Sequence, residues 1–263
     1  KKADAFSNKS SDFYADTGDA RLGPGLVSYN SPFKQWVSDE SIDGVNIPSG
    51  VYDNGAFIPR GQDGLKIDFD NGRVIFDSSF GANKTTLSGD YTVKDFNFYI
   101  TNQTEEQLIV ESKFDSNSRF KQSLGGIEPY KQVIPAIFVN SEMAENEPFA
   151  FGGEDLTKNI IKAVVISDSE YQLDGALSIF ADAARKTFSK IPFSDHPSTE
   201  YGDIKGGTYN YLNLSNSHSS EIPYFIEDVT VSKFSERAQS RLPGNLKVGF
   251  IDFDVSTNRF PRS

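Results

Sequence analysis

Two Asn-Gly dipeptides, Asn54-Gly55 and Asn71-Gly72, each lie between residues of alternating hydrophobicity. This dipeptide suits a type I′ turn, because both central residues of such a turn have positive φ. Between two alternating segments, it is the strongest short-range signal of a β-hairpin. The first half of the chain is therefore predicted to form antiparallel sheet.

The second dipeptide also predicts a register. A two-residue loop places Asp70 opposite Arg73 and Phe69 opposite Val74. One face of this hairpin is then apolar and consists of Leu65, Ile67, Phe69, Val74 and Phe76. The other face carries Lys66, Asp68, Asp70 and Arg73, with Ile75 as its one apolar residue. We expect the first face to be buried and the second to be solvated.

The predicted fold class is α+β, mostly antiparallel β with long hairpins and one main amphipathic helix packed on the C-terminal sheet. Three regions are expected: an extended arm or lead-in over 1–48, a hairpin-rich meander over 49–130, and an α+β domain over 131–263. The meander is expected to continue as a strand over 108–114. A change of side-chain parity at Lys94-Asp95 predicts a β-bulge within it.

One long helix is predicted after a buried strand over 160–166. Ser169 and Gln172 have the spacing of a capping box, and an apolar stripe at helical spacing runs from Leu173 to Phe188. Gly175 inside this helix suggests close packing. Further strands are predicted over 133–139, 209–214, 225–233 and 246–255, with a second bulge near Gly249.

Composition narrows the classes of function. The 263 residues include 22 Phe and 11 Tyr but no Cys, so disulfides and thiolate chemistry are excluded. A formal charge of −11 argues against nucleic-acid binding, which needs clustered Lys and Arg. This negative charge is consistent with a protein surface that repels DNA, and it is also consistent with a charge that only keeps the protein soluble. Both interpretations stay open. No apolar stretch is long enough for a membrane span, and no signal peptide is visible.

No motif names a chemistry. No serine lies in a nucleophile elbow, so neither histidine is predicted to belong to a Ser-His-Asp triad. His196 and His218 are expected to be exposed loop residues instead. Asp68-Phe69-Asp70-Asn71-Gly72 lacks the ligand spacing of a calcium loop. We therefore predict no catalytic, cofactor-binding or metal-binding residues and no enzyme activity. A hydrolase with a carboxylate pair stays open, since 37 acidic residues allow many pairs.

The order of elements in the second half carries a resemblance. An apolar strand ends at Val139, a second strand over 160–168 leads into one amphipathic helix over 173–188, and two closing strands follow over 225–233 and 246–255. This arrangement resembles the tail-terminator and neck proteins of tailed bacteriophages. The hairpin-rich stretch from Ser49 to Val74 resembles parts of other virion structural proteins of such phages. Compact terminators lack a segment equivalent to the first 130 or so residues.

The resemblance implies a homo-oligomeric ring at the head–tail junction, assembled in the bacterial cytoplasm and located in the virion. Its expected partners are further copies of itself and neighbouring neck, portal, adaptor or tail-tube proteins. DNA would pass through the lumen without specific binding, and no membrane or cofactor is involved. Such rings close through head-to-tail contacts.

Subunit contacts are predicted at exposed or arm-like positions. The polar loop over 235–245 has a basic tip, the lead-in offers aromatic anchors, and the first hairpin has an exposed turn. The candidate interface residues are Arg237, Arg241, Trp36, Phe33, Asn54 and Gly55. The alternative function is a β-rich module that binds carbohydrate through exposed Tyr and Trp36, or binds a protein partner.

Overall fold

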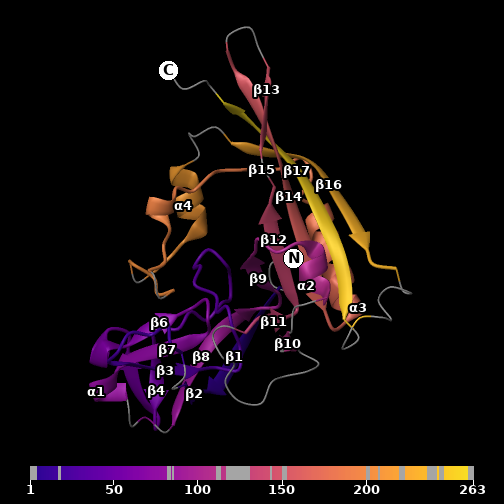
Figure 1. Ribbon diagram of the computed structural model, residues 1–263. Helices are drawn as coiled ribbons and strands as arrows, with labels where there is room; N and C mark the ends of the chain where they lie inside the picture. The colour runs from indigo at the N-terminus through magenta and orange to yellow at the C-terminus, as the bar shows by residue number, and fades with distance from the viewer. Residues whose placement is uncertain are drawn as a thin grey trace. The chain divides into compact units, whose positions relative to one another are not determined.

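The computed structural model describes residues 5–16, 19–81, 84, 86–110, 114–116, 131–142, 144–149, 153–199, 202–206, 208–218, 223–235, 242 and 246–259. The chain divides into two compact units, and most of it is β-sheet with few helices (Figure 1). Unit 1 comprises 1–97, 114–133 and 196–211. Unit 2 comprises 98–113, 134–195 and 212–263. The boundaries differ from the expected three regions because each unit combines segments that are distant in sequence.

Unit 1 contains two four-stranded antiparallel sheets. The order of the first is β1 (Phe6–Asp12), β8 (Leu87–Lys94), β4 (Gly50–Asp53) and β5 (Ala56–Pro59). The order of the second is β2 (Tyr14–Asp16), β3 (Leu26–Asn30), β7 (Arg73–Asp77) and β6 (Lys66–Asp68). Two short helical turns, η2 (Gln62–Gly64) and α1 (Ser78–Gly81), flank β6 and β7.

The core of unit 1 draws side chains from both sheets and from the predicted lead-in. Trp36 stacks on Tyr91 of β8 with ring centroids 4.3 Å apart, and Phe13 stacks on Trp36 at 5.5 Å. Trp36 is 2% exposed. Strands β1, β2 and β3 belong to the sheets. The described residues between 6 and 37 therefore form part of the folded unit rather than an extended arm, because their aromatic side chains bury apolar area.

A distant segment completes this core. Ile204 packs in the same hydrophobic cluster as the two sheets. Asp203 pairs with Arg60 at 2.8 Å, and the Phe69 N–H donates to the Gly202 carbonyl at 3.3 Å. The segment 202–204 is called the strap below, since it ties β5 and the end of β6 to a part of the chain that follows most of unit 2.

The first Asn-Gly turn is confirmed. Asp53 pairs with Ala56, so Asn54 and Gly55 are the two turn residues between β4 and β5. Their φ angles are 50° and 82°, as a type I′ turn requires.

The predicted register of the second hairpin is wrong by two residues. Asp68, not Asp70, pairs with Arg73, which leaves a four-residue connection over 69–72. The Asp68 carboxylate accepts hydrogen bonds from the backbone N–H and the side-chain amide of Asn71. Residues 31–36 also pair with this connection; for example, the Trp36 N–H donates to the Phe69 carbonyl at 2.8 Å. These contacts replace the tight turn.

The apolar face of this hairpin is confirmed, because all five of its residues lie in the unit 1 core. The solvated face is wrong. Asp68, Arg73 and Ile75 are 1%, 4% and 0% exposed. A two-residue shift preserves which face each side chain occupies. Burial of the charged pair is possible because the chain supplies further charged partners, described below.

Unit 2 is built on one sheet. Its order is β15 (Thr187–Phe188), β16 (Tyr224–Lys233), β17 (Lys247–Arg259), β14 (Asp155–Ser167), β12 (Ala136–Ser141) and β9 (Asn97–Ile100), and β13 (Glu145–Pro148) also pairs with β14. Strands β12 to β17 pair antiparallel in this sheet. The other elements of this unit are α2 (Glu105–Val110), α3 (Glu170–Ala181), η3 (Phe193–Asp195) and α4 (Tyr211–Ser217). Elsewhere in the chain, β10 (Asp115–Ser116) of unit 1 pairs with β11 (Val133–Ile134).

Helix α3 begins after Ser169, as predicted, but ends at Ala181 instead of continuing to Phe188. Arg185 has a φ of 62°, and its N–H donates to the Ile226 carbonyl, so the chain turns there to form β15 beside β16. A Cβ added at Gly175 would meet no neighbouring atom within 4 Å, so close packing does not explain this glycine.

Three further local predictions are wrong. Residues 105–110 and 211–217 are helical, whereas the sequence predicts strands over 108–114 and 209–214. Strand β8 ends at Lys94 and β9 lies in another sheet, so the parity change there marks a strand end and not a bulge.

Strand β17 pairs regularly with β14 through Gly249, so the second predicted bulge is also misplaced. The irregularity lies in β16, between Ile226 and Asp228. The apolar residues of β17 change parity because both faces are covered. Gly249 faces Leu173 of α3, and the opposite face carries Phe250, which contacts Phe234.

Candidate functional site

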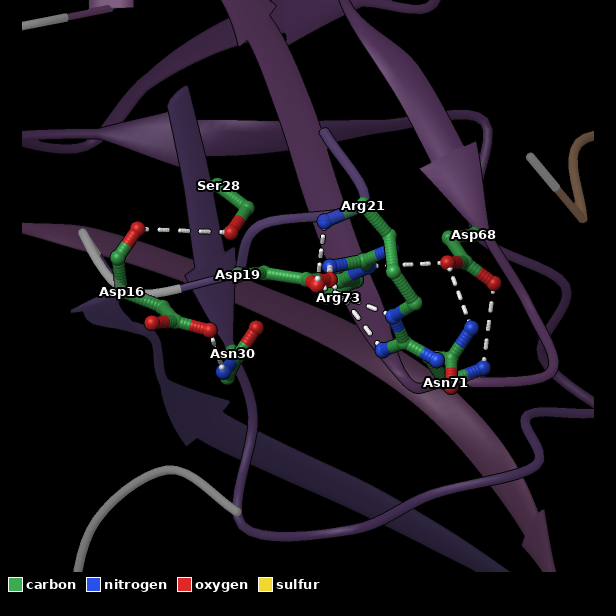
Figure 2. A network of polar contacts seen from close by, with 8 residues as sticks. All are labelled: Asp16, Asp19, Arg21, Ser28, Asn30, Asp68, Asn71 and Arg73. Carbon is green, nitrogen blue, oxygen red and sulfur yellow. Dashed lines mark hydrogen bonds and ion pairs between the residues drawn. The ribbon is translucent and has the colours of Figure 1, made fainter. Parts of the chain in front are cut away.

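A network of charged side chains is buried in unit 1 and links β6, β7 and the segment after β2 (Figure 2). Arg73 Nε donates to Asp68 Oδ2 at 2.8 Å, and Arg73 Nη1 donates to Asp19 Oδ2 at 2.6 Å. The side chains of Arg73, Asp68 and Asp19 are 5%, 1% and 2% exposed. Charged groups at this depth require such pairing, because an unpaired buried charge is strongly unfavourable.

Arg21 and Asn71 complete the network. Arg21 donates from Nε to Asp19 Oδ1 at 2.9 Å and from Nη2 to Asp19 Oδ2 at 3.1 Å, a two-pronged pairing (Figure 2). Asn71 donates from its backbone N–H and its Nδ2 to the two oxygens of Asp68, at 3.0 and 2.8 Å. Two guanidinium groups thus face two carboxylates, and their charges balance.

These contacts fix the ionisation of Asp19. Hydrogen bonds from Arg21 hold the pKa of Asp19 well below its usual value, and the hydrogen bond and charge of Arg73 act in the same direction against the opposing effect of burial. Asp19 in turn raises the pKa of Arg21. Asp19 is therefore a fixed negative charge near neutral pH, suited to holding structure and unsuited to exchanging protons.

A hollow of about 430 Å³ adjoins this network. Its lining residues are Arg21, Leu22, Asp68, Asp70, Asn71, Arg73, His196, Ser198, Thr199 and Gly202. Both guanidinium groups in this wall already bind carboxylates of the chain. The hollow is polar, and neither arginine in it is available as a lone cation for a ligand.

The two histidines have different surroundings. His196 is exposed, as predicted, and its Nδ1 accepts a hydrogen bond from the Ser198 N–H at 3.3 Å. His218 follows α4, with its Nε2 2.9 Å from Asp195 Oδ2 and its side chain only 13% exposed. The prediction of exposure is therefore wrong for His218, because α4 and η3 bring it beside that carboxylate.

A projecting surface characterises unit 2. Residues 145–148, 155–158 and 256–259 pair as three antiparallel strands, called the ribbon here. β13 is exposed along its whole length, whereas the buried residues of β14 begin only at Ala163, where α3 contacts the sheet. Figure 1 shows β13 at the end of the sheet remote from α3. Phe149, which follows β13, is 61% exposed.

The base of the ribbon is acidic. A hollow of about 440 Å³ there is lined by Glu142, Glu145, Lys158, Asn159, Ile160, Glu227, Asp254 and Val255. Four of these residues are acidic, and Lys158 already pairs with Glu147 at 2.9 Å. Hydrogen bonding to Glu147 raises the pKa of Lys158. This part of unit 2 therefore presents mainly negative charge.

The predicted interface residues fall into three groups. Arg237 and Arg241 lie outside the described residues. Asn54 and Gly55 are at the turn between β4 and β5, where Gly55 is exposed. Phe33 is partly buried, with Lys9 Nζ 5.0 Å from its ring centroid.

The buried Trp36 is unsuited to a surface contact or to the stacking of a sugar, and this corrects its predicted role. Sequence reasoning also missed Asp19 and Arg21. The signal for them was a pair of opposite charges in the Gly-rich segment that precedes β3.

No protein-family model matches the chain, and no curated protein matches it. Among the residues that the structure describes, no group of three His, Cys, Asp or Glu side chains is arranged to hold a metal ion. No helix in the same residues is long and apolar enough to cross a membrane.

Proposed function

We propose that this protein is a virion structural protein that forms a ring at the head–tail junction of a tailed bacteriophage, where it joins neighbouring neck, portal, adaptor or tail-tube proteins. The observation that carries the proposal is the ribbon. It lies at the end of the unit 2 sheet that is remote from α3 (Figure 1), and β13 is exposed along its whole length. An exposed ribbon that carries charged side chains can contact a neighbouring subunit of complementary charge.

Charge supports the same proposal. The chain has a formal charge of −11, and acidic side chains gather at the base of the ribbon. A ring that lets DNA pass without holding it needs a wall that repels phosphate. The order of β12, β14, α3, β16 and β17 along the chain supports the proposal, because it is the order of elements that the resemblance to neck proteins uses.

Electron microscopy of the purified protein, and of particles that contain it, tests this proposal. Closed rings are the expected result. The variant Glu145→Lys reverses a charge on the exposed face of β13 and is expected to reduce the fraction of rings. Glu106→Lys makes the same change at an exposed position on α2 and serves as the matched control. A strictly monomeric subunit in the assembled particle contradicts the proposal.

A further inference from the structure

Strand β16 lies at a margin of the sheet of unit 2 (Figure 1). On its inner side it pairs with β17 as far as Lys233. On its outer side β15 pairs only with Tyr224 and Phe225, and Ile226 bonds to the backbone of 185–186. From 227 to 233, no strand in the described part of the chain pairs with the outer edge.

The hydrogen-bond pattern identifies the backbone groups that face outward. The N–H of Phe234 donates to the Val248 carbonyl, on the inner side. Inward and outward residues alternate along a strand that lies in an antiparallel ladder. Thr230 and Ser232 therefore direct their N–H and C=O groups at β17, while Val229, Val231 and Lys233 direct theirs outward.

The middle of this edge, between the flanking charges of Asp228 and Lys233, lacks the features that protect other margins of the protein. The exposed strand β13 is four residues long, ends at Pro148 and carries Glu145 and Glu147. β5 also has four residues and ends at a proline. Between 229 and 232, β16 reads Val-Thr-Val-Ser, with no charge and no proline. Such an edge is a template for another strand.

We propose that β16 pairs antiparallel with β16 of a second copy of this chain, about a two-fold axis through Thr230. In this register Val229 lies opposite Val231 of the second copy, and each Thr230 lies opposite its counterpart. Asp228 lies opposite Ser232. Apolar β-branched pairs and Thr–Thr pairs are favourable across strands, and no like charges meet.

The alternative register, centred on Val231, is poorer because it places Val229 opposite Lys233. Lys233 also forms an ion pair with Asp174 of α3. This register would therefore place a lysine that is paired within its own chain opposite an apolar valine. The edge is thus self-complementary in one register, which argues for a second copy as the occupant.

The contact is isologous, so it uses the same edge on both copies and stops at two. It goes beyond the proposed ring, because a two-fold contact does not close a ring. In an assembly that also forms rings, it would join two rings face to face or hold subunits as dimers before assembly.

A cysteine at position 230 tests the register. The chain has no native Cys. Paired Thr230 residues occupy a non-hydrogen-bonded site with Cα atoms about 4.5 Å apart, within disulfide range. Thr230→Cys is therefore expected to form a disulfide-linked dimer of twice the 29.1 kDa chain mass under mild oxidation. Ser232→Cys, on the same face and edge, is the control and is expected to stay unlinked, because its two copies are four residues out of register.

Proline at position 231 tests the edge itself. Val231→Pro removes an outward N–H but no hydrogen bond to β17, so unit 2 is expected to keep its circular dichroism spectrum while the dimer is lost in light scattering. Val231→Thr keeps the N–H and a β-branched shape, and is expected to remain dimeric. A wild-type monomer at high concentration, a dimer that survives Val231→Pro, or equal cross-linking of the two cysteine variants overturns the proposal. None of these results bears on whether rings form.

Discussion

Arg73 forms ion pairs with two buried carboxylates at once, those of Asp68 and Asp19. The second partner of Asp19, Arg21, has a side chain that is 55% exposed. The two arginines therefore bind the same carboxylate from very different surroundings. Their removal is expected to have unequal consequences, since water screens the exposed pair.

Replacement of Arg73 by methionine leaves both buried carboxylates without their shared cation. We expect Arg73→Met to lower the free energy of unfolding by about 3–5 kcal/mol, as found when one partner of a buried pair is removed. Urea denaturation followed by fluorescence of Trp36, in the core of the same unit, measures this loss. Arg21→Met is the comparison, and a loss equal to that of Arg73→Met would contradict this account of the network.

Asp19 predicts a dependence on pH. Its pKa is lower in the folded protein than the value of about 3.9 in an unfolded chain. As the pH falls, the unfolded state takes up a proton first, so the contribution of Asp19 to stability is complete above about pH 5 and declines below it. The difference in urea midpoint between wild type and Asp19→Asn is expected to be large at pH 7 and to narrow towards pH 3. A difference that is constant with pH would show that the charge of Asp19 is not responsible.

At the scale of elements, the contact between α3 and β17 depends on one residue without a side chain. A Cβ at Gly249 would lie 2.9 Å from Leu173 Cδ1 and 3.0 Å from Leu177 Cδ1. Both leucines are buried. The helix therefore approaches the strand closely at this position, in contrast to Gly175 in α3 itself, where space is open.

Valine at position 249 must displace both leucine side chains. We expect Gly249→Val to cost about 1–3 kcal/mol, as overpacking of a core does. Gly175→Ala, the matched change at an open site, is expected to stabilise the protein by up to about 1 kcal/mol through helix propensity. Thermal unfolding of the two variants compares them directly. Destabilisation by both, or by neither, would contradict the assignment of Gly249 as the contact point.

The elements that could be predicted from sequence are those whose signals are local. The Asn54-Gly55 turn, the start of α3 after Ser169 and the pairing of β16 with β17 follow from turn chemistry, capping and alternation. The register at Asn71 could not be predicted, because residues 31–36 bind that connection from a distance of about forty positions. The helix over 211–217 was missed because its residues also suit a strand.

The candidate site also combines features that the sequence predicts with features that it does not. Asp68 and Arg73 were identifiable as the polar face of a hairpin, but their burial depends on Asp19, which is brought in by the long-range contact at 2.6 Å. The ribbon could not be predicted, because nothing in the sequence near β13 shows that this strand lies at the end of the sheet remote from α3. Which part of a sheet a helix covers depends on packing between distant segments, and such packing produces no periodic pattern in the sequence.

At the scale of the whole molecule, the position of the strap in the sequence determines how much of the chain must be synthesised before unit 1 can fold completely. Ile204 and Asp203 complete the core and ion pairs of unit 1, yet they are synthesised after most of unit 2. A nascent chain that ends before residue 202 carries both sheets of unit 1 with an apolar surface still uncovered. Unit 1 is therefore complete only after residue 204 has been synthesised and unit 2 only after β17, so the two units are completed close together in the order of synthesis.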